Sequence, residues 1–191
     1  MGFRGSYIAS AGNNEALPAV GDVVDNSPIH MLQHSVGRHA QKTAHAIDGA
    51  GAQNDNIFQV TGIVQVHLLV LHIDTVTDAT TFSGVKFELY DSTVATNITG
   101  ATDCSGCVVG AMIFKKGLLA VGVEFVNTTV GVISEAAANK INFEPFFAFQ
   151  KTGGAATYIR LAFTGDGATD IVGDIESHWT PISHNGNLVS V

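Results

Sequence analysis

The feature of this sequence that most constrains its fold is a succession of short apolar runs separated by glycine, asparagine and aspartate. Apolar and polar residues alternate within the clearest run, 85–90, and β-branched and aromatic residues are frequent in the others. Alternation with a period of two is typical of a β-strand with one buried face. The runs predicted to form strands are 57–61, 63–73, 85–90, 108–114, 118–126, 130–134, 141–150, 158–164 and 174–182.

These runs predict an all-β fold, an antiparallel β-sandwich or a jelly-roll-like barrel. Strands do not alternate with helices along the chain, which argues against a doubly wound fold. Only residues 134–140, SEAAANK, have a helical composition, enough for one or two turns. We expect a hairpin turn at 115–117 and a second turn at 165–170, between the last two strands.

The aromatic residues divide the chain near residue 56. Of the 11 Phe, 3 Tyr and 1 Trp, only Phe3 and Tyr7 precede that position. Because large apolar side chains build cores, residues 57–191 are predicted to form the β-sandwich domain. Residues 1–56 are predicted to form an extended N-terminal arm, with at most a short helix after Pro28 and a connector at 46–56.

The alternation also predicts which side chains of two strands share a face. In 63–73, one face holds Val64, Val66, Leu68 and Val70, and the other holds Gln65, His67, Leu69 and Leu71. In 174–182, one face holds Ile175, Ser177, Trp179 and Pro181, and the other holds Glu176, His178 and Thr180.

Charge and composition exclude several classes of protein. Nine Lys and Arg against 17 Asp and Glu give a net charge of −8, which repels nucleic-acid phosphates. The longest apolar run, 63–73, is too short and too polar to span a bilayer, and the N-terminus has no signal-peptide core. Two cysteines do not make a disulfide framework. We therefore expect a protein made in a reducing cytoplasm, without nucleic-acid or membrane partners.

Cys104 and Cys107 are spaced as zinc ligands or a redox pair can be. Structural zinc needs four ligands, however, and the chain has no second cysteine pair. The favoured interpretation is two thiols in a loop or at a strand edge. Metal ligation and a disulfide formed after release from the cell are the alternatives.

Four histidines precede the predicted domain: His30, His34, His39 and His45. His30 and His34 would share one face of a helix, but a metal site there needs a nearby carboxylate or a further histidine. The favoured interpretation is that these histidines are polar contacts of the arm with a partner. If they lie at a subunit interface, their protonation near pH 6 would make assembly sensitive to pH.

Two further groups each have two interpretations. Asp166 and Asp170, followed by Asp174, either form a turn or hold calcium in a glycine-rich loop. The cluster Phe143, Phe146, Phe147 and Phe149 is either a ligand surface or, as we favour, part of the core together with an interface. The sequence contains neither a Gly-x-Ser-x-Gly elbow nor a phosphate-binding loop. No catalytic residue, cofactor or metal ligand is therefore assigned, and no enzymatic activity is expected.

Three successive stretches together form one pattern of strand and turn residues: IFQVTGIVQVHLLVLHIDTVTD, GVKFELYDST and TYIRLAFTGDGATDIVGDIESHWTPIS. Their pattern resembles that of structural proteins of tailed-bacteriophage virions, of the capsid decoration or cement type. The resemblance covers most of 57–191 and none of 1–56. The matching residues are Phe58, Val60, Gly62, Val76, Thr77, Lys86, Leu89, Tyr90, Asp91, Trp179, Pro181, Ile182 and Ser183.

The resemblance implies a virion protein, made in the host cytoplasm, that binds the major capsid protein and stabilises the head shell. It also implies a homo-oligomer, commonly a trimer at a symmetry axis. The low charged fraction, 14%, suits a protein that buries much of its surface in an assembly. A tail or fibre component that binds the host is the alternative, and a hydrolase on a β-scaffold is a third, weaker hypothesis.

Overall fold

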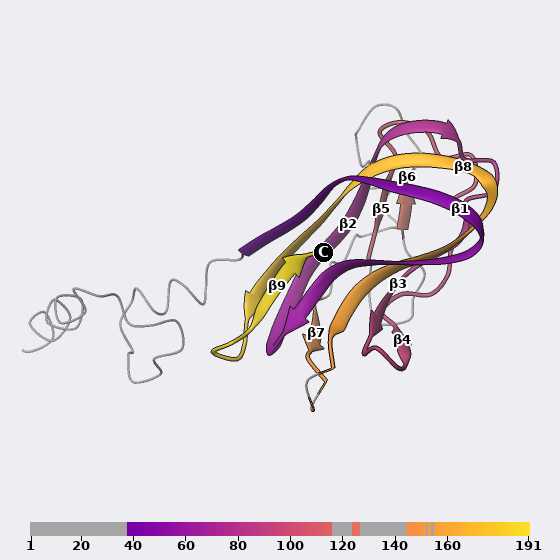
Figure 1. Ribbon diagram of the computed structural model, residues 1–191. Coiled ribbons are helices and arrows are strands. Elements are labelled where there is room, and N and C mark those ends of the chain that lie inside the picture. The colour runs from indigo at the N-terminus through magenta and orange to yellow at the C-terminus, as the bar shows by residue number, and fades with distance from the viewer. Residues whose placement is uncertain (1–37, 116–123, 127–144, 152, 154) are drawn as a thin grey trace, which may run out of the picture.

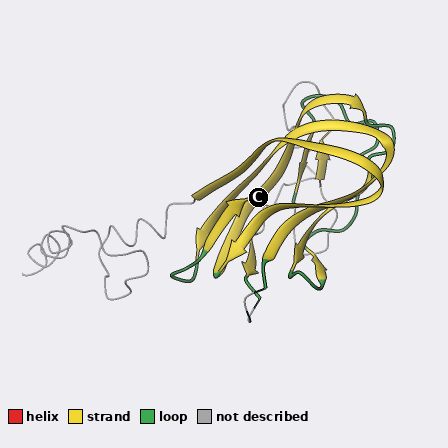
Figure 2. Ribbon diagram, in the orientation of Figure 1, coloured by secondary structure: helices red, strands yellow, loops and turns green. Residues whose placement is uncertain are grey.

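The computed structural model describes residues 38–115, 124–126, 145–151, 153 and 155–191. All regular structure in these ranges is β, and Figure 2 shows strands and loops there but no helix. Every strand pair in the described ranges is antiparallel, so the all-β prediction is confirmed. The strands are β1 (Arg38–Thr61), β2 (Ile63–Asp78), β3 (Ser83–Tyr90), β4 (Ala95–Asn97), β5 (Met112–Phe114), β6 (Glu124–Val126), β7 (Phe146–Phe149), β8 (Thr157–Pro181) and β9 (Asn187–Ser190).

Two long strands, β1 with 24 residues and β8 with 25, organise the sheet. They pair along most of their length and bend together (Figure 1). The first half of β8 also pairs with β3, and its second half pairs with β2. The sheet, whose main path runs β4-β3-β8-β2-β5-β6, therefore curls over on itself. Its two halves enclose one cluster of buried side chains.

The predicted turn at 165–170 is wrong, because this segment continues β8 through the bend. Gly165 pairs with Gly51, and Asp170 pairs with Asp48, so β1 accompanies β8 through the whole segment. The register shifts between Asp48 and Ala50, and such a β-bulge bends a strand sharply. The Asp and Gly residues of this segment thus lie in a bend of two paired strands, and not in a loop that reverses the chain.

The predicted arm and connector are corrected in the same region. Residues 38–56 belong to β1, so the predicted boundary at residue 56 falls inside a strand. Between residues 46 and 56 only Ile47 is buried, which explains why this segment has the composition of a connector. Its place in the sheet depends on backbone pairing with β8, which composition does not reveal. The helix expected after Pro28 lies outside the described residues, as do the segments 130–134 and 134–140.

The predicted faces are confirmed for β8 and corrected for β2. Ile175, Ser177, Trp179 and Pro181 are all buried, as the alternation predicts. In β2, Val64 and Val66 are buried, but the buried set then continues with Leu69, Leu71 and Ile73. Val66 pairs with Trp179 and Leu68 with His178, so His67 is an extra residue in β2. This bulge moves the side chains that follow, as far as the next register shift after Ile73, to the opposite face.

The predicted hairpin of 108–114 and 118–126 is confirmed as an antiparallel pair but not in its register. Phe114 pairs with Glu124 and Met112 with Val126, whereas a tight turn at 115–117 would place residue 114 opposite residue 118. Residues 116–117 themselves lie outside the described residues. The strand at its start is also shorter than predicted, because β5 begins at Met112. Within the predicted run 141–150, the described part contains β7.

Candidate functional site

Four exposed apolar side chains lie in and next to three neighbouring strands: β7, the beginning of β2 and the end of β8. In β7, Phe147 and Phe149 are 60% and 57% exposed, whereas Phe146 is buried. Phe149 pairs with Ile63 of β2, and the N–H of Ile182 donates to the carbonyl oxygen of Ile63 at 2.9 Å. Ile63 and Ile182 are themselves exposed. We name Phe147, Phe149, Ile63 and Ile182 the apolar row.

The phenylalanine cluster predicted from the sequence is therefore divided between core and surface. Phe146 packs in the core cluster, while Phe147 and Phe149 point outward because alternate side chains of a strand lie on opposite faces. Phe143 lies outside the described residues. Large exposed aromatic side chains in one patch are typical of a surface that binds another macromolecule.

Two open cavities flank the apolar row, and Lys151 lines both. The cavity beside Phe149 has a volume of about 310 Å³ and is lined by Leu89, Asp91, Val94, Thr96, Phe149, Lys151 and Thr157. The cavity beside Ile63 has a volume of about 390 Å³ and is lined by Gly62, Ile63, Gln150, Lys151, Gly153, Ser183 and Asn185. Together with the row, they give this end of the molecule an uneven apolar surface with polar margins.

The charged groups of the first cavity form a pair. Lys151 Nζ lies 3.1 Å from Asp91 Oδ2. The N–H of Val94 donates to Asp91, and this bond together with the one from Lys151 holds the pKa of the carboxyl below its ordinary value. An ionised and partnered carboxylate is poorly suited to proton transfer near neutral pH. The pair suits recognition of a polar group at the margin of an apolar contact.

Cys104 and Cys107 are free thiols in the loop between β4 and β5, and both are buried in the core cluster. Burial raises the pKa of Cys104 to about 12 and that of Cys107 to about 11. Both are therefore neutral thiols at physiological pH, and the thiolate is the form that attacks electrophiles or binds metals. The interpretation as loop thiols agrees with this placement.

The aspartates considered for calcium are held by protein donors. Asp166 accepts a hydrogen bond from the Thr81 hydroxyl at 2.6 Å. Asp174 accepts from the N–H of Ala44 at 2.8 Å and from the Gln41 amide at 3.1 Å. In the described part of the chain, these carboxylates do not gather into a group of three ligands. The geometry thus gives the calcium alternative no support.

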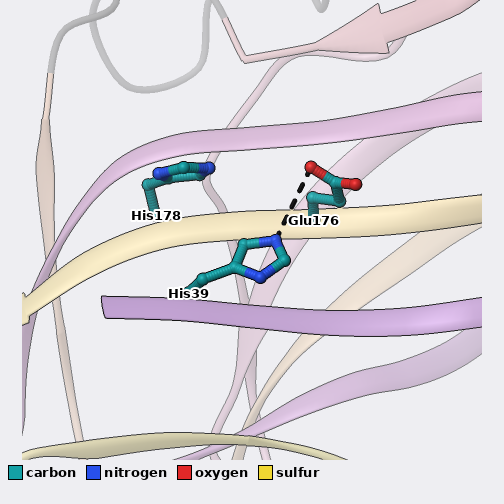
Figure 3. A group of neighbouring side chains, drawn as sticks. All are labelled: His39, Glu176 and His178. Carbon is teal, nitrogen blue, oxygen red and sulfur yellow. Dashed lines mark ion pairs between the residues drawn. The ribbon is translucent and has the colours of Figure 1, made fainter. Parts of the chain in front are cut away.

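The structure brings one of the predicted histidines into a cluster with residues far away in the sequence. His39 of β1 lies beside Glu176 and His178 of β8 (Figure 3). His30 and His34 lie outside the described residues. The sequence placed Glu176 and His178 on one strand face but could not show that His39 pairs with His178. The N-terminal histidines have no carboxylate or further histidine beside them in the sequence. The strand register places a carboxylate, Glu176, and a second histidine, His178, next to His39.

His45 makes a contact within β1 itself. Because β1 bends, His45 Nε2 lies 3.0 Å from Asp55 Oδ2, and Lys42 Nζ donates to the carbonyl oxygen of Asn56 at 3.1 Å. Burial, and secondarily the positive charge of Lys42, lowers the pKa of His45 despite Asp55. The folded chain therefore favours the neutral imidazole.

We expect stability to depend on pH through His45. The folded-state pKa of His45 lies below its ordinary value of 6.5. The contribution of His45 to the free energy of unfolding is therefore fully present above about pH 6.5 and is lost as pH falls through the folded-state pKa. The variant His45→Gln cannot be protonated, so the difference in Tm between pH 7.5 and pH 5.5 should be smaller than in the wild type. The exposed His67, which contacts the Thr180 hydroxyl, provides the control variant His67→Gln. An unchanged pH dependence in His45→Gln would contradict the assignment.

Comparison with known proteins identifies no relative. No family model matches the chain, and neither a curated protein nor a solved structure matches it significantly. Among the described residues, no helix is long and apolar enough to cross a bilayer.

Proposed function

We propose that this chain is a structural protein of a virus particle, of the capsid decoration or cement type, which binds the major capsid protein and stabilises the head shell. The proposal takes the apolar row as the docking surface. The resemblance of the strand and turn residues to structural proteins of tailed phages suggests the partner.

The observation that carries the proposal is the apolar row itself. Phe147 and Phe149 expose more than half of their surface, on a sheet face where Ile63 and Ile182 extend the patch. Transfer of apolar surface out of water yields about 25 cal/mol per Å². Aromatic side chains are also enriched at the centres of protein interfaces. A row of this kind is therefore best explained by a protein partner that covers it.

Charge and fold support the same proposal. Charged residues make up 14% of the chain, against about 25% in average soluble domains, as expected when much of the surface lies in contacts. A curled antiparallel sheet with long paired strands gives a rigid body on which such a surface can be presented. Copies of this chain that contact one another around a symmetry axis of the shell would form a closed ring, and we propose a trimer.

The double variant Phe147→Ser/Phe149→Ser should bind the particle much more weakly than the wild type. Removing both rings from the interface should reduce the number of particle-bound copies at least tenfold, while the variant keeps its fold because both rings are exposed. Quantitative mass spectrometry of purified particles, with the major capsid protein as reference, measures that number. The control variant is Val109→Ser, since Val109 is 50% exposed but lies outside the apolar row.

The same measurement on wild-type particles separates the candidate roles. A copy number comparable to that of the capsid protein supports decoration or cement. A handful of copies points instead to the alternative, a tail or fibre component. Absence from particles, or incorporation of the double variant at the wild-type level, would overturn the proposal.

A further inference from the structure

We propose that His39, Glu176 and His178 form a binding site for a divalent transition-metal ion such as Zn²⁺. One ligand atom from each of the three side chains lies within 4.8 Å of the other two. His39 Nε2 is 3.6 Å from Glu176 Oε2, and the two imidazole rings have centroids 5.1 Å apart. Figure 3 shows the three side chains gathered over the strands that carry them.

The strand register explains why these three residues meet. His39 pairs directly with His178, and Glu176 lies two residues before His178 in β8, on the same face. Side chains in these positions of an antiparallel pair are close neighbours. The opposite face of β8 is buried in the core through Ile175 and Trp179, so the backbone that carries the cluster is firmly held.

A hydrogen bond orients the carboxylate for this role. Gln41 pairs with Glu176 across the strands, and its Nε2 donates to Glu176 Oε1 at 3.3 Å. The same nitrogen also donates to Asp174 Oδ2 at 3.1 Å, which fixes the amide. The other carboxylate oxygen, Oε2, is the one that faces His39. Partners of this kind orient metal ligands and strengthen metal binding.

The ligand set selects the class of metal. Two imidazoles and one carboxylate suit Zn²⁺, Co²⁺ or Ni²⁺, whereas Ca²⁺ and Mg²⁺ prefer sites made only of oxygen ligands. Tetrahedral zinc places its ligand atoms about 3.3 Å apart, so the separation between His39 and Glu176 already fits. A side-chain rotation of His178, which is exposed, can close the remaining distance. The exposed face leaves a fourth position for water or for a ligand from another molecule.

A metal at this site would fasten the beginning of β1 to β8. His39 is the second residue of β1. A link between the two strands there would prevent the first residues of β1 from separating from β8. This inference is independent of the docking surface, which lies on β7, β2 and the residues after β8.

Titration of the full-length chain with Co²⁺ tests the site. Co²⁺ has a visible absorption that reports ligation, and Zn²⁺ should displace it. We expect one equivalent of Co²⁺ to bind and the Tm to rise with Zn²⁺. The variants His39→Asn and His178→Asn should each weaken Co²⁺ binding at least tenfold, while their Tm without metal stays close to that of the wild type because both residues are exposed.

The matched control is His72→Asn. His72 forms a similar exposed pair with Asp74, at 2.8 Å, but belongs to no group of three ligands in the described ranges. This variant should bind Co²⁺ as the wild type does, and so should His30→Asn/His34→Asn, which removes the other histidine pair suggested by the sequence. Absence of Co²⁺ binding, or equal loss in His72→Asn or in the His30/His34 variant, would overturn the proposal.

Discussion

Replacing Gly173 by alanine is expected to destabilise the folded chain by about 3 kcal/mol, near the upper end of the usual cost of overpacking a core. Gly173 lies in β8, where it pairs with His45 of β1 and Ile73 of β2. An added Cβ would overlap the carbonyl oxygen of His72 and approach Leu71 Cδ1 to 2.7 Å. The carbonyl belongs to the strand backbone and Leu71 is fully buried, so neither can move without disturbing the sheet.

The control for this variant is Gly51→Ala, in the bend of β1. Gly51 has φ of +73°, but an added Cβ there meets nothing within 4 Å. Its replacement should cost only the backbone strain of a left-handed conformation, about 1 kcal/mol. Urea unfolding of both variants measures the difference. Equal free energies of unfolding in Gly173→Ala and Gly51→Ala would show that close packing at β2 is not what requires glycine at 173.

Replacing Glu88 by alanine is the second large effect, and we expect it also to cost about 3 kcal/mol. Glu88 is only 3% exposed and holds two cations on the outer face of β3 and β8. Arg160 donates through Nε at 2.7 Å, with Nη2 at 2.6 Å, and Lys86 Nζ lies 2.6 Å away. The Arg160 guanidinium also stacks 4.3 Å from the Tyr90 ring centre. Without Glu88, a largely buried guanidinium loses its counter-charge.

The matched control is Asp74→Ala, which removes an exposed ion pair with His72. Exposed pairs contribute less than about 1 kcal/mol, so this variant should unfold near the wild-type urea concentration. A loss in Glu88→Ala no greater than in Asp74→Ala would contradict the assigned role of the cluster.

The same carboxylate should contribute to acid sensitivity. Burial alone would raise the pKa of Glu88, but the hydrogen bonds and charges of Lys86 and Arg160 outweigh it and leave the pKa below 4.5. Its stabilisation is therefore present above about pH 4.5 and is lost as pH falls through the folded-state pKa. The difference in free energy of unfolding between the wild type and Glu88→Gln, measured by urea unfolding, should become smaller as pH falls through this range.

Some properties of this protein follow from its sequence because they depend on local pattern. Alternation within 85–90 and 174–182 predicts strands and, for Trp179 and its neighbours, the buried face. The absence of helical periodicity predicts the all-β class. The outward orientation of Phe147 and Phe149 follows once β7 is known to be a strand whose other face packs in the core.

Other properties depend on which strands become neighbours, and local pattern does not contain that information. The polar segment 46–56 becomes a strand only because β8 offers backbone partners along its length. The bulge at His67 reverses the faces of β2 because its partner strand lacks a matching residue.

The cluster of His39, Glu176 and His178 illustrates the same division between sequence and tertiary structure. The sequence by itself determined a set of strands with their buried faces, including the face that carries Glu176 and His178. Only the tertiary structure decided that His39 lies opposite His178, more than 130 positions away in the chain. The physical reason is that strand register is fixed by long-range hydrogen bonding and by burial of a shared core, to which distant segments contribute together.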